Sequence, residues 1–288
     1  MKIYCCQSDI VWENKPANHA SILQLLEKTS PAPGSLVVLP EMFSTGFSMN
    51  VPGIYERQPP ETEDFLGRTA LQLQVYLLGG VVSIAHDGRG RNEAVLFSPQ
   101  GLEAARYAKM QPFTLAGEAK NYLAGNQIVT FSWQNFVVSP FICYDLRFPE
   151  LFRAAGSRGA QLFTVIANWP VTRIQHWVTL LQARAIENQA YVAGVNRCGN
   201  DPRYAYSGRT LIVSPRGEIL TDAGDGEKVI SAELDLPGLL AYRAEFPFLQ
   251  DKRTDYQSPP PPLPERDLRS GAHPDGFGET PQTLAGRG

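Results

Sequence analysis

The residue best placed for covalent chemistry is Cys143, which follows the apolar segment FVVSPFI and precedes YDLRFPELFR. The apolar segment is typical of a strand, and Pro149 favours the start of a helix, so the thiol is expected at a strand-to-helix elbow. Backbone N–H groups are free at such an elbow, and they could stabilise the oxyanion that forms when a thiolate attacks a carbonyl group. A buried structural cysteine is the alternative interpretation of this position.

A nucleophilic cysteine needs a base, because a thiol with a pKa of about 8.5 is only slightly ionised at neutral pH. Among the four histidines, His176 is the best candidate for a Cys–His pair, since it is predicted at the start of a helix just beyond a strand end. A solvent-facing residue in the first turn of that helix is the alternative interpretation.

A carboxylate paired with a lysine could help the thiol instead. Glu41 ends the apolar run LVVLPE, and Lys109 lies in ARYAKMQPF between a predicted strand and a loop that contains proline. Glu41 could take the thiol proton, and the Lys109 ammonium could bind the developing oxyanion. Each residue alone fits an ordinary loop position. Three such groups at predicted strand ends favour one shared site, because open α/β sheets bind ligands there.

The elements that must position these residues alternate between strand and helix up to about residue 250. Strands are predicted over 36–41, 79–86, 160–168 and 190–196, and helices over 18–28, 62–76 and 176–189. This alternation predicts an α/β layered architecture. Two further segments, 94–107 and 210–223, share a strand, then Ser-Pro-x-Gly, then a second strand, and each predicts a β-hairpin. A duplication and a shared turn preference are alternative explanations of this similarity.

Composition narrows the class of protein. The chain has 288 residues, 43% of them apolar and 19% charged, with a formal net charge of -3. This balance is typical of a globular protein and provides no basic surface for nucleic acid or anionic membrane. No apolar run approaches the roughly 18–20 residues that span a bilayer, and the N-terminal segment lacks the apolar stretch of a secretory signal.

The cysteines and the composition of the C-terminal segment indicate the compartment of the protein and the extent of its domain. Four cysteines in so long a chain do not suggest a disulfide framework, so we expect a cytoplasmic protein, with adjacent Cys5 and Cys6 on opposite faces of a strand. Proline and glycine dominate the end of the chain. We therefore expect a domain over 1–250 and a largely disordered Pro/Gly-rich tail over 251–288.

Three motifs resemble the nitrilase superfamily of carbon–nitrogen hydrolases, whose hallmark is a Glu–Lys–Cys triad in this chain order. They are LPEMFSTGF around Glu41, KMQPF around Lys109 and CYDLRFPELFR around Cys143. The segments ANWP, QARAIENQAYVAGVNRCG and YSGRTLIVSPRGE resemble later blocks of the same family, so the resemblance covers about residues 1–250. The first and third motifs are more similar to the ω-amidase branch than to true nitrilases.

The resemblance implies a single-domain, four-layer α-β-β-α sandwich that forms a homodimer. It implies that Cys143 is the nucleophile, that Glu41 is the general base, and that Lys109 and the backbone N–H of Tyr144 stabilise the oxyanion. Glu118, in FTLAGEAKNYLAGN, matches the second glutamate of the family, which orients the lysine. Asp145 and Arg147 are interpreted as structural partners of the elbow. No metal, nucleotide or flavin is required.

The expected substrate is a small carboxamide, such as the ω-amide of a 2-oxo acid like 2-oxoglutaramate, cleaved through a cysteine thioester with release of ammonia. A fixed guanidinium suits the carboxylate of such a molecule, so Arg173 is a candidate for its binding and Trp169 for a flat wall beside it. A solvent-facing arginine is the alternative interpretation. A nitrilase, another small-amide or carbamoyl hydrolase, and a non-catalytic interaction scaffold are the alternative functions.

Overall fold

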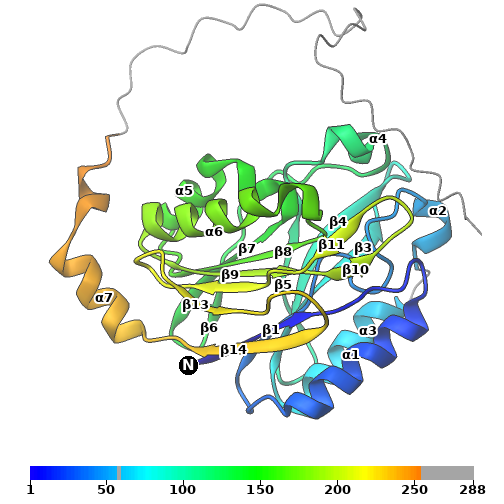
Figure 1. Cartoon of the computed structure of the whole chain (residues 1–288), viewed down its shortest axis with the longest axis horizontal. Coiled ribbons are helices and arrows are strands. Elements are labelled where there is room, and N and C mark those ends of the chain that lie inside the picture. The colour runs from blue at the N-terminus through cyan, green and yellow to red at the C-terminus, as the bar shows by residue number, and fades with distance from the viewer. Residues whose placement is uncertain (57–59, 254–288) are drawn as a thin grey trace, which may run out of the picture. The chain divides into compact units, whose positions relative to one another are not determined.

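The computed structural model in Figure 1 describes residues 1–56 and 60–253. Residues Met1–Pro247 form one compact unit, and the short helix η4 (Phe248–Asp251) belongs to a second unit that begins at Phe248. The predicted tail over 251–288 lies outside the described residues from position 254 onward.

Two six-stranded sheets form the centre of this unit. The first has the order β14-β1-β2-β3-β4-β5 and the second β13-β12-β9-β8-β7-β6, with a separate two-stranded ribbon of β10 and β11. The strands of the first sheet are β1 (Lys2–Gln7), β2 (Leu36–Val38), β3 (Tyr76–Ile84), β4 (Gly90–Phe97), β5 (Glu103–Ala108) and β14 (Lys228–Glu233). Those of the second and of the ribbon are β6 (Phe131–Trp133), β7 (Phe136–Ile142), β8 (Leu162–Ala167), β9 (Tyr191–Asn196), β10 (Cys198–Asn200), β11 (Ala205–Ser207), β12 (Leu211–Val213) and β13 (Ile219–Asp222).

Helices cover the outer face of each sheet. In Figure 1, α1 (Lys15–Thr29) and α3 (Glu61–Leu73) lie on one side, and α5 (Pro149–Ser157) and α6 (Ile174–Asn188) lie on the other. The remaining helices are the short α2 (Val51–Ile54) and α4 (Glu118–Asn121), α7 (Leu236–Glu245), and the 3-10 turns η1 (Thr114–Ala116), η2 (Cys143–Arg147) and η3 (Val171–Arg173). The predicted four-layer α-β-β-α sandwich is confirmed.

The two sheets share one topology. Each contains three neighbouring parallel strands, β1-β2-β3 in the first and β7-β8-β9 in the second, followed by an antiparallel hairpin. The hairpins are β4-β5 and β12-β13, so both Ser-Pro-x-Gly hairpins predicted from the sequence are confirmed, and they occupy equivalent places. Because β2 and β8 are therefore equivalent central strands, the loops that follow them face each other at the same end of the sandwich.

The apolar core follows the alternation of side chains along the strands. In β1, Ile3 and Cys5 pack in the cluster that contains the second sheet, whereas Tyr4 and Cys6 pack with buried residues of α1 and α3. Cys5 and Cys6 thus lie on opposite faces of their strand, as predicted. Burial raises the pKa of the Cys6 thiol to about 12, which is consistent with inert core residues.

Three helices and strands begin or end a few residues away from their predicted boundaries, for local reasons. The first helix begins at Lys15, before the predicted 18, because the Asn14 side chain accepts a hydrogen bond from Ala17 N. The third helix ends at Leu73, before the predicted 76, because Gln74 adopts a left-handed conformation with φ 55°. The strand predicted over 36–41 ends at Val38, which leaves Glu41 in the following turn.

Candidate active site

Cys143 is the first residue of η2 and directly follows β7. Its φ of 47° lies in the left-handed region, which non-glycine residues rarely adopt and which is often found at functional sites. The buried Asp145 carboxylate holds this turn, because it accepts hydrogen bonds from Ile142 N at 3.0 Å, from Gln111 N at 2.9 Å and from the Tyr107 hydroxyl at 2.8 Å. The interpretation of Asp145 as a structural partner of the elbow agrees with these contacts.

Glu41 reaches the same place through the turn after β2. Its segment crosses directly over Gly80 in β3, where a Cβ atom would lie 2.4 Å from Met42 N and 2.6 Å from Glu41 Cα. Glycine is required at this position, because a side chain would displace the backbone that carries Glu41. The Glu41 side chain is completely buried.

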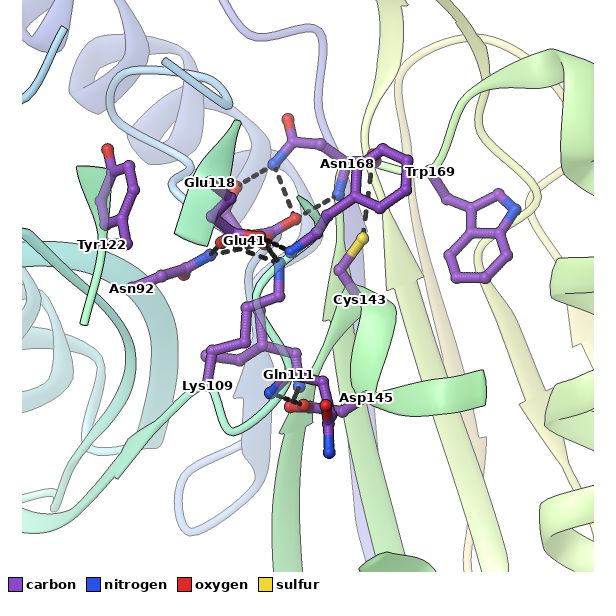
Figure 2. Close-up of polar contacts among 12 residues, drawn as sticks. Glu41, Asn92, Lys109, Gln111, Glu118, Tyr122, Cys143, Asp145, Asn168 and Trp169 are labelled. Carbon is purple, nitrogen blue, oxygen red and sulfur yellow. Dashed lines mark hydrogen bonds and ion pairs between the residues drawn. The ribbon is translucent and has the colours of Figure 1, made fainter. Parts of the chain in front are cut away.

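Lys109 directly follows β5, and its ammonium joins the two glutamates (Figure 2). Its Nζ atom lies 2.9 Å from Glu41 Oε1, 3.0 Å from Glu118 Oε1 and 2.9 Å from Glu118 Oε2. An ammonium has three N–H groups, so all of them are engaged. The ring of Phe47 covers the ammonium, with its centroid 5.1 Å from Nζ. The structure therefore places Glu41, Lys109 and Glu118 in one buried cluster.

Two asparagines that the sequence reasoning missed complete the cluster. Asn92 Nδ2 donates to Glu41 Oε1 at 2.7 Å and to Glu118 Oε1 at 3.0 Å. Asn168 donates to Glu41 Oε2 from its backbone N at 2.8 Å, and its backbone oxygen lies 3.9 Å from Cys143 Sγ. The position of Asn168 directly after β8, in the ANWP segment, was the one available signal.

The buried charges explain the protonation states. Burial by itself lowers the pKa of Lys109, but the Glu118 and Glu41 carboxylates outweigh it and raise that pKa well above its usual value. Burial also raises the pKa of the Cys143 thiol, and the negative charge of Glu41 raises it further, while Lys109 opposes the shift. At neutral pH the site therefore contains a charged lysine and a protonated thiol.

A cavity opens in front of Cys143. It is lined by Phe47, Phe113, Cys143, Tyr144, Arg147, Asn168, Trp169, Pro170, Arg173, Tyr204 and Tyr206. Most of these side chains are aromatic, and two are cationic. The sequence-predicted pair Trp169 and Arg173 lies in this wall, where Trp169 Nε1 donates to Arg173 O at 2.8 Å.

Arg147, which the sequence suggested as a structural partner, lines the same cavity. Its guanidinium lies 4.7 Å from the Trp169 ring centroid, and Arg173 lies 5.8 Å from that of Phe113. Among the described residues, neither arginine forms an ion pair with a carboxylate. Two unneutralised guanidinium groups on the wall of a cavity suit an anionic ligand.

His176 does not take part in this arrangement. It is exposed, its Nδ1 atom lies 3.4 Å from Arg147 Nη1, and it is absent from the described lining of the cavity. The contacts of the Cys143 thiol are with Asn168, not with a histidine. The geometry therefore favours the Glu–Lys–Cys interpretation over a Cys–His pair.

The described residues contain neither a cluster of metal ligands nor a membrane-spanning helix. Within residues 1–56 and 60–253, no group of three or more His, Cys, Asp or Glu side chains is arranged to hold a metal ion. In the same described part of the chain, no helix combines the length and apolar character needed to cross a membrane.

Comparisons with known proteins agree with the geometry. The chain is 40% identical over 255 residues to omega-amidase YafV of Yersinia enterocolitica, covering 87% of this chain and 96% of that protein. It is 31% identical over 254 residues to 2-oxoglutaramate amidase of Bacillus subtilis, covering 88% and 98%. A crystal structure of a CN-hydrolase superfamily protein from Xanthomonas campestris, with an arsenic adduct in its active site, superposes with a TM-score of 0.83 at 30% identity, covering 88% and 97%. The family model for carbon-nitrogen hydrolases matches residues 2–244, so the chain belongs to the carbon-nitrogen hydrolase family.

Proposed function

We propose that this protein is an amidase that cleaves the C–N bond of a small carboxamide through a thioester on Cys143. The observation that carries the proposal is the buried cluster of Glu41, Lys109 and Glu118 beside a thiol at the base of an open cavity. A nucleophile that lines a cavity, with a carboxylate and a cation buried behind it, provides the groups that acyl transfer requires.

The first step forms the bond between sulfur and the substrate carbon. Because the Cys143 thiol is protonated at neutral pH, it needs a base at the moment of attack. Glu41 takes this proton while the sulfur electron pair attacks the carbonyl carbon, and the carbonyl π electrons move to oxygen. The product is a tetrahedral intermediate with a negatively charged oxygen.

The oxyanion is stabilised by the Tyr144 N–H and by Lys109. Tyr144 is the second residue of η2, and among the described residues its backbone N–H has no acceptor. Lys109 donates twice to Glu118, so it can direct one of these N–H groups to the oxyanion and keep the other in place. Glu118 thus acts as the positioning residue of Lys109.

Breakdown of the intermediate needs the proton that Glu41 has taken. An amide nitrogen is a poor leaving group until it is protonated, so Glu41 donates this proton as the C–N bond breaks and ammonia leaves. Glu41 then accepts a proton from water, whose oxygen attacks the thioester. The C–S bond of the second tetrahedral intermediate then breaks, the acid product leaves, and Glu41 returns its proton to the sulfur to restore the thiol.

The substrate that we propose is the ω-amide of a 2-oxo acid, such as 2-oxoglutaramate. Within residues 1–56 and 60–253, Arg147 and Arg173 on the cavity wall have no carboxylate partner, which supports a carboxylate on the substrate, and Trp169 supplies a flat wall. The names of the similar proteins from Yersinia enterocolitica and Bacillus subtilis support the same class of substrate.

The test is ammonia release from three kinds of compound under the same conditions. The proposal predicts a kcat/KM for 2-oxoglutaramate well above that for uncharged short-chain amides, and little turnover of nitriles. Preferred turnover of nitriles would assign the protein to the alternative nitrilase function. Absence of turnover with every amide would overturn the proposal.

We also propose that residues 1–250 form the catalytic domain, that residues 251–288 are a separate extension, and that the protein is a cytoplasmic homodimer. The end of the family match at residue 244 supports the domain boundary. The resemblance to the nitrilase superfamily is what supports the homodimer. A chain truncated after residue 250 should retain kcat/KM, and light scattering should give twice the monomer mass.

A further inference from the structure

The Glu41 carboxylate already accepts four hydrogen bonds, two on each oxygen. Oε1 accepts from Asn92 Nδ2 at 2.7 Å and from Lys109 Nζ at 2.9 Å. Oε2 accepts from the backbone N of Asn168 at 2.8 Å and from its Nδ2 at 3.3 Å. A carboxylate offers about four lone-pair sites, so all of them are occupied. The four donors therefore fix the direction of both oxygens, and the donor on the oxygen that gains a proton has to give way.

The Asn168 side-chain amide is the donor that can move at least cost. Lys109 is a buried cation held by two carboxylates, and the backbone N–H of Asn168 is fixed by the main chain. The bond from Asn168 Nδ2 to Oε2 is the longest of the four. The same Nδ2 group also donates to the backbone oxygen of Glu41 at 2.7 Å, so it keeps a strong bond when it leaves the carboxylate.

The Cys143 proton lies beside the same residue. The backbone oxygen of Asn168 accepts from Cys143 Sγ at 3.9 Å, and Figure 2 shows Asn168 in contact with both the thiol and the Glu41 carboxylate. Asn168 therefore contacts both the thiol and Glu41 Oε2, which is the oxygen that we assign as the proton acceptor. One residue orients the S–H group through its carbonyl and the receiving oxygen through its two N–H donors.

We infer that Asn168 is the positioning residue for proton transfer between Cys143 and Glu41. In the resting enzyme its amide donates to Oε2 and maintains the charged carboxylate. As the proton moves from sulfur to Oε2, the amide releases Oε2 and keeps its bond to the Glu41 backbone, and it returns when Glu41 gives the proton to the leaving nitrogen. This inference rests on the proposed function, because it assigns Cys143 and Glu41 as the partners in transfer.

The first arm of the test removes the amide. Asn168→Ala keeps both backbone contacts but lacks the Nδ2 donor, so we expect kcat to fall roughly 10- to 100-fold with little change in KM. We also expect the acidic limb of the kcat/KM profile to move to higher pH, because a donor that favours the charged carboxylate is lost. An unchanged kcat together with an unchanged acidic limb would overturn the inference.

The second arm keeps the size of the side chain. In Asn168→Asp the introduced carboxylate repels Glu41 at neutral pH, and only after it gains a proton can it donate to Oε2. We therefore expect this variant to regain activity on acidification, whereas Asn168→Ala does not. If thermal denaturation shows that Asn168→Ala does not fold, the pH profile of Asn168→Asp alone tests the role of Asn168. Equal loss at every pH would contradict the inference.

Asn196 provides the matched control. It lies at the end of β9, the strand next to β8, and holds the same segment by accepting from Trp169 N at 2.7 Å and donating to Trp169 O at 3.0 Å. It makes no contact with Glu41 among the hydrogen bonds of the described residues. Asn196→Ala should lower thermal stability and leave the acidic limb in place. A shift of the limb in this variant equal to that in Asn168→Ala would assign the effect to general loosening.

Alkylation of Cys143 by iodoacetamide separates this inference from the proposed function. The reaction needs no substrate, and mass spectrometry measures it at each pH. Because Oε2 is no longer held in place toward the thiol in Asn168→Ala, we expect slower alkylation in this variant than in the wild type at neutral pH. Wild-type ammonia release by Cys143→Ala or Glu41→Gln would overturn the proposed function itself. Loss of activity in those two variants, with wild-type kcat and alkylation in Asn168→Ala, would overturn the inference about Asn168 alone.

Discussion

Lys109 donates hydrogen bonds to both carboxylate oxygens of Glu118, at 3.0 and 2.9 Å, and its remaining donor to Glu41. The ammonium is therefore held from two sides in a buried position, 2% exposed. Two carboxylates and one ammonium leave a net negative charge beside the thiol. Burial, together with this charge, raises the pKa of the Cys143 thiol and keeps it protonated at neutral pH.

Substitution of Glu118 tests the role of this contact. Glu118→Gln removes one of the two charges that hold Lys109, so the ammonium loses its fixed place beside the oxyanion. We expect kcat/KM to fall by roughly 100-fold or more, measured as ammonia release. Glu103→Gln is the control, because Glu103 pairs with Arg106 on the exposed end of β5. Equal activity of the two variants would contradict the assigned role.

Substitution of the cavity arginines tests substrate recognition. A charge-assisted hydrogen bond contributes about 1.5–3 kcal/mol, so Arg173→Ala and Arg147→Ala should each raise KM for an anionic amide roughly 10- to 100-fold. The KM for an uncharged amide should change little. Arg68→Ala, which breaks an exposed ion pair with Asp64, serves as control. An unchanged KM for the anionic amide in both variants would contradict a role of these arginines in binding the substrate.

The glycine pair in β3 offers a comparison between neighbouring positions. A Cβ at Gly80 would meet the backbone of Met42 and Glu41, whereas one at Gly79 would meet the flexible side chains of Leu66 and Phe43. Gly80→Ala should therefore lower kcat/KM much more than Gly79→Ala does, because it displaces Glu41, the proposed base. Circular dichroism and thermal denaturation would show whether each variant folds. A larger loss in Gly79→Ala would contradict the argument.

The folding stability of the protein should depend on pH because Asp145 is buried. Burial raises the pKa of this carboxyl to about 7 in the folded protein, compared with about 3.9 in an unfolded chain. A raised pKa contributes stability below the unfolded value, and this contribution is lost as the pH rises from about 4 to 7. Asn has no proton to lose, so the free energy of unfolding of Asp145→Asn, relative to the wild type, should rise over this range. Denaturation of both proteins at pH 4.5 and 7.5 measures this difference in the free energy of unfolding. If the free energies of the two proteins changed in parallel, the prediction would be wrong.

Much of the fold could be predicted from the sequence, because it depends on local patterns. The short β-branched runs became β2, β3, β8 and β9, and both Ser-Pro-x-Gly segments became hairpins, since turn residues act within a few positions. Glu41, Lys109 and Cys143 could be selected as candidates, because each follows a predicted strand. That they meet at one cluster depends on the order of the strands.

The remaining site residues depend on contacts that are distant in the sequence. Asn168 and Glu41 are separated by 127 positions, and they meet because β8 and β2 are equivalent central strands of two facing sheets. Asn92 lies within a strand pattern, where an asparagine has no local signature of its partners. The orientation of Arg147 toward the cavity follows from the short helix η2, whose 3-10 geometry was not predicted.

The most direct test of the account is the identity of the covalent intermediate. The protein should be mixed with 2-oxoglutaramate, quenched with acid during turnover, digested and examined by mass spectrometry. The account predicts that the peptide containing Cys143 gains the mass of the substrate less ammonia, and that Cys143→Ala shows neither the adduct nor turnover. An adduct on another residue, or full turnover by Cys143→Ala, would contradict it.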